Sequence, residues 1–116
     1  MPQELSIIQK TYDLVKWYTP LLSRLPKDHR FCLGTRISSE LYDVREILVR
    51  VQYQRDKLQS LYTVNGKLDV LRYQTRLLHD LKLMSVKRYQ YVGQQINGIG
   101  CELGGWINQQ KQIKRR

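Results

Sequence analysis

Residues 33–51 read LGTRISSELYDVREILVRV, and the hydrophobic pattern of this stretch decides the fold class. Apolar side chains recur every three or four positions, a spacing that places them on one face of an α-helix. These side chains are Leu33, Ile37, Leu41, Val44, Leu48 and Val51. Charged residues fall mainly on the other faces: Arg36, Glu40, Asp43 and Arg50. The stretch therefore predicts an amphipathic helix with one face in a core.

Similar patterns on both sides of this stretch, divided by capping and turn residues, predict three more helices. Asp28, Asp56 and Ser85 can each cap the start of a helix. The predicted helices span residues 4–24, 28–53, 56–82 and 85–110, and a basic tail at 111–116 is expected to fray. Because the connections are short and nothing reads as strand, we predict an all-α fold, an up-down-up-down antiparallel four-helix bundle, with residues 1–116 in one domain.

Two positions test the continuity of these helices. Pro20 removes a backbone hydrogen bond inside the first helix, which predicts a kink near Lys16 to Trp17 or an irregular last turn. Asn65-Gly66 is a turn signal inside the third helix, and a break there would give five segments. The leucine register resumes immediately afterwards, so we predict a continuous third helix.

Glycines and large aromatics in the sequence bear on assembly. Gly93, Gly100 and Gly104 would allow another helix, of this chain or of a neighbouring copy, to pack close to the last helix. The large apolar aromatic residues are Trp17, Phe31 and Trp106. Since a thin bundle cannot cover all of them, we expect a homo-oligomer.

The charge of the chain indicates a polyanionic partner. Twenty Lys and Arg stand against ten Asp and Glu, so the formal net charge is +10. The excess is largest after residue 80, where the tail alone contributes Lys111, Lys114, Arg115 and Arg116. No apolar run approaches the ~20 residues that span a bilayer, and the first residues do not resemble a signal peptide. We therefore expect a cytoplasmic protein without a membrane partner.

Motifs for catalysis or metal binding are missing from the sequence. His29 with Cys32 is the only close pair of soft-metal ligands, whereas a structural zinc site needs four. Cys32 and Cys101 fall inside helical patterns and are expected to be reduced and buried. No phosphate-binding loop, dinucleotide fingerprint or nucleophile elbow occurs. We expect no enzymatic activity, no cofactor, no metal and no small-molecule substrate.

Basic residues near the third connection form the candidate binding site. Arg72 and Arg76 are four positions apart and therefore share a helix face. Lys82, Lys87 and Arg88 surround the turn into the last helix. Tyrosines are interleaved with them: Tyr73, Tyr89 and Tyr91. Guanidinium groups pair with phosphates and tyrosine faces stack on unpaired bases, which favours a nucleic-acid site over a solvated helix face, the alternative reading.

Several motifs in this order resemble one protein family. They are QKTYDL at 9–14, LPKDHRF at 25–31 with Leu33-Gly34, YQRDKL at 53–58, Leu71-Arg72-Tyr73, Arg76-Leu77, DLKL at 80–83, Ile99-Gly100 and LGGWI at 103–107. Together they cover nearly the whole chain. In these motifs the chain resembles the accessory protein (Avd) of diversity-generating retroelements, whose fold is related to the four-helix proteins encoded in ribosomal RNA intervening sequences.

The resemblance implies a basic four-helix bundle that assembles into a homopentamer. It also implies partners: the retroelement's reverse transcriptase and template RNA, with DNA as a further candidate ligand, in error-prone cDNA synthesis. The basic positions that match the family's motifs are Arg72, Arg76 and Lys82, with Lys10 and Arg30 as the remaining candidates. A structural oligomer of the intervening-sequence type, which binds a protein partner, is the alternative.

Overall fold

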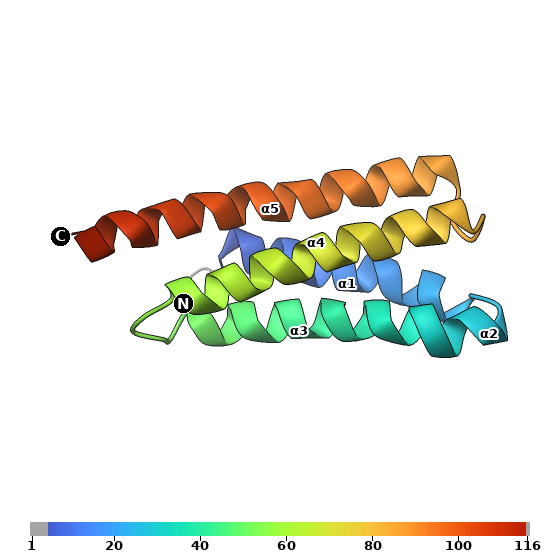
Figure 1. Cartoon of the computed structure of the whole chain (residues 1–116), viewed down its shortest axis with the longest axis horizontal. Coiled ribbons are helices and arrows are strands. Elements are labelled where there is room, and N and C mark those ends of the chain that lie inside the picture. The colour runs from blue at the N-terminus through green and yellow to red at the C-terminus, as the bar shows by residue number, and fades with distance from the viewer. Residues whose placement is uncertain (1–4, 116) are drawn as a thin grey trace.

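The computed structural model describes residues 5–115 and shows a four-helix bundle, which confirms the predicted fold class (Figure 1). Among residues 5–115 there are four long helices and two short helical segments, and no strand. Their bounds are α1 (Ser6–Ser23), α2 (Lys27–His29), the π-helix η1 (Arg30–Gly34), α3 (Thr35–Val51), α4 (Leu58–Asp80) and α5 (Val86–Arg115). The bundle is elongated, with extents of 51 × 25 × 22 Å.

The long helices pack in a ring in the order α1, α3, α4 and α5, and α5 closes the ring against α1. Successive long helices run in opposite directions (Figure 1). The segment between α1 and α3 and the turn between α4 and α5 therefore lie at one end of the bundle, which we call the turn end. The loop between α3 and α4 lies at the opposite end, toward the C-terminus.

A narrow apolar stripe on each long helix forms the core. On α3 the predicted stripe is buried from Ile37 to Val51, and only Leu33, in η1, is half-buried. The stripe of α4 includes Leu61, Leu68 and Leu78, all with no exposed surface. Burial of these side chains is the main stabilising contribution to the bundle.

The structure shows how the helices continue at Pro20 and at Asn65-Gly66. The first helix continues past Pro20 to Ser23 and ends irregularly, because the Arg24 N–H donates to the Leu21 carbonyl (3.2 Å) instead of to a carbonyl four residues back. The third predicted helix is continuous through Asn65-Gly66, as predicted. A Cβ on Gly66 would meet nothing within 4 Å, so this glycine serves no close packing contact.

The second predicted helix, residues 28–53, differs from the structure in two respects: it contains a π-helical segment, and it ends at Val51. At the junction of η1 and α3, the hydroxyl of Thr35 donates to the carbonyl of Arg30, five residues back, at 3.2 Å. Gly34 is buried: a Cβ there would lie 3.4 Å from the side chain of Leu25, just after α1, and 3.9 Å from the carbonyl of Leu22 in α1. Cys32, within this segment, is exposed instead of buried as expected.

The expected frayed tail is also wrong, because α5 continues to Arg115. Lys114 pairs with Asp56 of the α3–α4 loop (3.3 Å between Nζ and Oδ2), and Lys111 lies over the ring of Tyr62. Cations in the last turn also suit the negative end of the helix dipole. Arg116, and Glu4 where the first helix was expected to begin, lie outside the described residues.

Within the described part of the chain, none of the helices has both the length and the apolar character needed to cross a membrane.

Candidate nucleic-acid interface

Arg72 bridges α4 and α5 on the outside of the bundle. Its Nη1 lies 2.7 Å from Oδ1 of Asp69, one turn earlier on α4, and its Nε donates to Oδ1 of Asn97 on α5 at 3.3 Å. The side chain is 36% exposed. Its pair with the well-exposed Asp69 is weak in water, because solvent screens it. Arg72 is thus held in one orientation while part of its guanidinium faces solvent.

Gly100 makes room for this guanidinium. A Cβ at Gly100 would lie 2.7 Å from Nη2 of Arg72, closer than real contacts allow. A residue with a side chain at this position would displace the guanidinium from α5. Gly100 is therefore the one glycine of the last helix for which a close approach is seen, and the approaching group is a side chain, not another helix.

The other two glycines expected to admit a helix do not do so within residues 5–115. A Cβ at Gly93 or Gly104 would meet nothing within 4 Å. Packing by a neighbouring copy of the chain, the second option, remains a prediction.

Arg76 lies one turn after Arg72 on the same face of α4. Its Nε is 3.7 Å from Oδ2 of Asp80, and its side chain is 66% exposed. This pair is long and well hydrated, so it leaves the Arg76 guanidinium accessible to a phosphate.

A hollow of ≈ 660 Å³ runs beside Arg72 between α4 and α5. Gly93, the side-chain amides of Gln90, Gln94 and Asn97, and the ring of Tyr89 contribute to its lining, and none of its lining residues is acidic. Amides present both hydrogen-bond donors and acceptors, which base edges require, and the arginine supplies the positive charge.

Thr75, which also lines the hollow, connects it to the core. The Thr75 hydroxyl and the fully buried Tyr18 hydroxyl of α1 are 2.8 Å apart and share a hydrogen bond. Burial raises the pKa of Tyr18 to about 12, an effect that the bond to Thr75 opposes in part. The bond satisfies both polar groups at the base of the site and fixes α4 against α1.

Lys82 occupies the turn that follows α4, and its backbone has a φ of 64°. The Lys82 N–H donates to the carbonyl of His79 (2.9 Å), and the Leu83 N–H donates to that of Leu78 (2.8 Å). These two bonds form a Schellman motif, in which glycine is the usual residue at the position that Lys82 holds. The left-handed backbone carries a lysine at a conformational cost of about 1 kcal/mol.

The start of α5 places Lys87 and Arg88 at the same turn. The Arg88 N–H donates to Oγ of Ser85 at 3.2 Å, so Ser85 caps the helix as predicted. Lys87 and Arg88 are exposed, and neither forms an ion pair with a residue in the described range 5–115.

A basic residue that the sequence analysis missed joins this end of the bundle. Arg24, just after α1, and Arg88 line the same small hollow of ≈ 270 Å³, together with Trp17. This neighbour could have been predicted from the fold class, because an antiparallel four-helix bundle places the end of the first helix beside the start of the fourth.

The three tyrosines predicted to stack on bases differ in how far their rings are exposed. Tyr73 is 71% exposed. Tyr89 is half-buried and stacks on His79, with 4.7 Å between ring centroids. Tyr91 contacts Trp17, with 5.5 Å between centroids. Among these three tyrosines, Tyr73 has the most exposed ring.

Lys10 and Arg30 lie apart from Arg72 and Arg76. Lys10, on α1, pairs with Glu102 of α5 (3.4 Å between Nζ and Oε2). Arg30 belongs to η1, where its Nη1 donates to the carbonyl of Ser23 at 3.4 Å. The structure therefore divides the seven predicted residues into three groups: Arg72 and Arg76 on the α4–α5 face, Lys82, Lys87, Arg88 and Arg30 at the turn end, and Lys10 apart from both.

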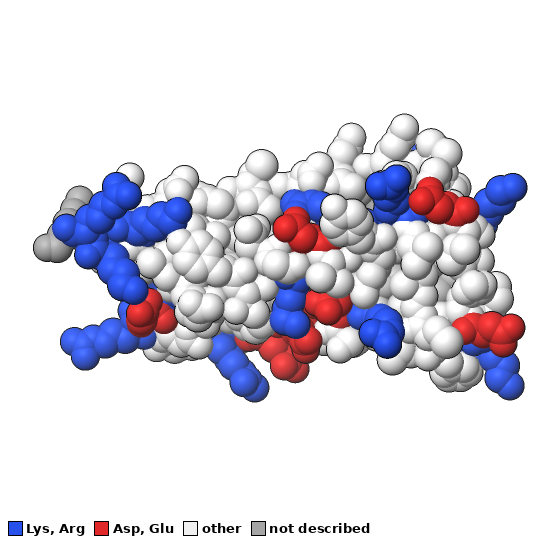
Figure 2. Space-filling model, viewed as in Figure 1, with Lys and Arg blue, Asp and Glu red and all other residues white. Residues whose placement is uncertain are grey.

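A further concentration of positive charge lies at the opposite end of the bundle. Figure 2 shows Lys and Arg gathered where α5 ends, whereas acidic groups lie between basic ones along the middle. The described basic residues at the end of α5 are Lys111, Lys114 and Arg115.

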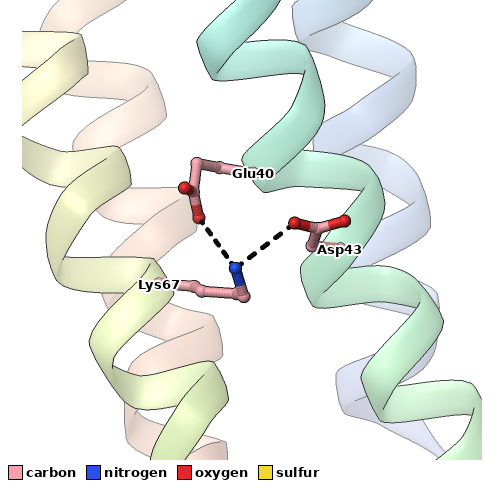
Figure 3. Close-up of polar contacts among 3 residues, drawn as sticks. All are labelled: Glu40, Asp43 and Lys67. Atoms are coloured by element: carbon pink, nitrogen blue, oxygen red, sulfur yellow. Dashed lines mark hydrogen bonds and ion pairs between the residues drawn. The ribbon is translucent and has the colours of Figure 1, made fainter.

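The acidic residues Glu40 and Asp43 of α3 are engaged by a lysine from α4 (Figure 3). Lys67 Nζ lies 3.2 Å from Oδ2 of Asp43 and 3.7 Å from Oε2 of Glu40. The cluster joins two helices, which is a structural role. No group of three or more His, Cys, Asp or Glu residues in range 5–115 could hold a metal ion, and Cys101 is exposed, contrary to expectation.

Comparison with known proteins places the sequence in a family. Residues 5–110 match the family model described as bAvd-like, which covers nearly the whole chain. No curated protein matches the chain.

Proposed function

The chain belongs to the bAvd-like family, and on that premise we propose that it is a non-enzymatic accessory protein of a diversity-generating retroelement. In this role it binds the reverse transcriptase together with template RNA or cDNA and supports mutagenic reverse transcription. The polymerase performs the chemistry, and the bundle supplies binding surfaces.

The observation that carries the proposal is the geometry of Arg72. Its guanidinium is aligned by Asp69 and Asn97 beside a hollow that is lined by amides and by no carboxylate. A guanidinium that is already oriented loses less side-chain entropy when it pairs with a phosphate. Arg76 extends the row by one turn, and its charge is well exposed.

Basic residues at the turn end extend the proposed surface beyond α4. Lys82 follows shortly after α4, Lys87 and Arg88 lie in the first turn of α5, and Arg24 lines a hollow together with Arg88. A nucleic-acid strand along α4 would meet Arg72, then Arg76, then this cluster. Contacts of this kind are to phosphates and therefore position a strand without reading its sequence.

We propose a homopentamer as the assembled form, located in the cytoplasm. Support comes from large apolar side chains that are more than half exposed on the single chain, among them Tyr53, Val86 and Ile113. A bundle with the stripes described above has no core position for them, so a neighbouring copy is the proposed cover.

Co-purification tests the proposal. The chain is co-expressed with a reverse transcriptase of the same retroelement, with and without the template RNA, and isolated through a tag on the polymerase. Wild type is compared with the Arg72→Ala/Arg76→Ala variant. Arg36→Ala/Arg50→Ala is the control, because it removes the same charge from exposed positions of α3.

We expect wild type and the α3 control to be retained and the α4 variant to be lost or strongly reduced when RNA is present. A wild-type chain that binds neither the polymerase nor the RNA would contradict the proposal. That result would favour the alternative, a structural oligomer of the intervening-sequence type with a protein partner.

A further inference from the structure

A groove between α1 and α3 lies on the opposite side of the helix ring from Arg72. It consists of two adjoining hollows of ≈ 370 Å³ and ≈ 510 Å³, and Thr19 and Tyr42 line both of them. The groove is distinct from the α4–α5 site, since none of the residues that line it belongs to α4 or α5.

One half of this α1–α3 groove is built around the ring of Tyr12. The guanidinium carbon of Arg45 lies 5.1 Å from the ring centroid, and Nζ of Lys16 lies 5.8 Å from it. Both distances are within the range of cation–π attraction. Tyr12 is 43% exposed, so part of its ring remains open to solvent.

The other half ends on η1, where Phe31 is 65% exposed. The guanidinium carbon of Arg30 lies 5.1 Å from the centroid of this ring. A large apolar ring at this exposure has no core function. Between the two halves stands Tyr42, which is 49% exposed.

The charges along the groove all have one sign. Lys16, Arg30 and Arg45 line it, and no aspartate or glutamate does. From Arg30 to Arg45 the chain advances by 15 residues, or roughly 20 Å at ~1.5 Å per residue. Three aromatic rings and three cations are thus spread over a length that suits several nucleotides.

We infer that the α1–α3 groove is a second binding site, for single-stranded nucleic acid. Bases stack on Tyr12, Tyr42 and Phe31, while Lys16, Arg30 and Arg45 meet the phosphates. An acidic protein segment would use the same cations but would leave the exposed rings without a matching partner, so the aromatic faces favour a nucleic acid. The inference rests on the proposed function for the class of ligand and adds a surface to it.

Fluorescence anisotropy with a labelled oligouridylate tests the inference. The full chain is compared with Tyr12→Ala/Tyr42→Ala and with Tyr12→Phe/Tyr42→Phe, which keeps the ring faces. We expect the alanine pair to weaken binding to the groove by at least about thirtyfold, seen most clearly where Arg72→Ala/Arg76→Ala has removed the α4–α5 site, and the phenylalanine pair to bind like wild type. In a duplex the base faces are covered, so neither pair should change duplex binding.

Combination with the α4 substitutions separates this site from the proposed one. A strand too short to bridge the bundle occupies the two surfaces separately, so each pair of substitutions alone should remove one binding event and the four substitutions together should remove both. If only the α4 variant loses affinity, the inference is overturned and the proposed function stands. If only the groove variants lose affinity, the groove stands and the α4–α5 assignment fails.

Two further results would overturn the inference. One is equal loss in the alanine and phenylalanine pairs, which would exclude the ring faces as the binding element. The other is displacement of the oligouridylate by polyglutamate at equal charge, which would indicate an acidic protein partner. Circular dichroism and thermal unfolding verify that each variant is folded, and Lys16→Gln/Arg45→Gln provides a second test that leaves the rings in place.

Discussion

Nη2 of Arg72 lies so close to Gly100 that a Cβ at this glycine would be 2.7 Å away. The contact joins α4 to α5 through a side chain that the proposed function assigns to phosphate binding. Since Nη2 is the flexible far end of its side chain, it can move aside without disturbing the helices. The position of the guanidinium thus depends on the absence of a side chain at residue 100.

Gly100→Ala should therefore separate binding from stability. Alanine is favoured over glycine by about 1 kcal/mol in a helix interior, so the thermal midpoint should stay equal or rise. RNA affinity should fall, because Arg72 is displaced from Asn97. Gly98→Ala is the control, since a Cβ there meets nothing within 4 Å. Equal RNA affinity in both variants, measured by anisotropy, would show that the placement of Arg72 is irrelevant.

The hydrogen bond between Tyr18 and Thr75 makes a prediction about stability. Thr75→Val leaves the buried Tyr18 hydroxyl without a partner and should lower the free energy of unfolding by about 1–3 kcal/mol. Tyr18→Phe/Thr75→Val removes both polar groups and should recover most of this loss. Urea unfolding measures both values, and a double variant as unstable as the single one would contradict the account.

Burial of the same tyrosine predicts a loss of stability at high pH. The pKa of Tyr18 is raised from 10.0 to about 12 in the folded chain. Above pH 10 the unfolded chain releases this proton first, so the stabilising contribution is complete below pH 10 and declines as the pH rises toward 12. The slope from this group is about 1.4 kcal/mol per pH unit. Tyr18→Phe should unfold with a shallower pH dependence in this window, and identical curves would exclude the effect.

Lys82 should lower the free energy of unfolding through its left-handed backbone while its charge raises RNA affinity. Lys82→Gly relieves the left-handed backbone and should raise the free energy of unfolding by about 1 kcal/mol. Lys82→Ala removes the same charge but keeps a Cβ, and it should give no such gain. Both variants should lose RNA affinity to a similar extent. If alanine stabilises as much as glycine in urea unfolding, the backbone explanation is wrong.

The helical fold could be predicted from the sequence because each long helix has a regular apolar stripe. Residues 37–51 show this directly, since every apolar position in the predicted stripe is buried. The i,i+4 spacing of Arg72 and Arg76 likewise predicted that they share a face, and their separate acidic partners lie on the same helix.

Other features of the structure could not be predicted from the spacing of apolar and charged residues in the sequence. The turn at 30–34 is π-helical, which the apolar pattern does not indicate, and Phe31 and Cys32 are exposed there. The partner of a tyrosine is also set by tertiary packing, so the stacking of Tyr89 on His79 could not be read from spacing. The extension of α5 to Arg115 depends in part on Asp56, which lies far away in the sequence.

The central claim, that Arg72 and Arg76 bind phosphates, is tested most directly by the salt dependence of RNA binding. Affinity for single-stranded template RNA is measured by anisotropy over a series of salt concentrations for wild type, Arg72→Ala/Arg76→Ala and the control Arg36→Ala/Arg50→Ala. Each lost phosphate contact should reduce the slope of log affinity against log salt by about 0.7. We expect a reduction by about 1.4 for the α4 variant and a wild-type slope for the control. Identical slopes in all three proteins would contradict the claim.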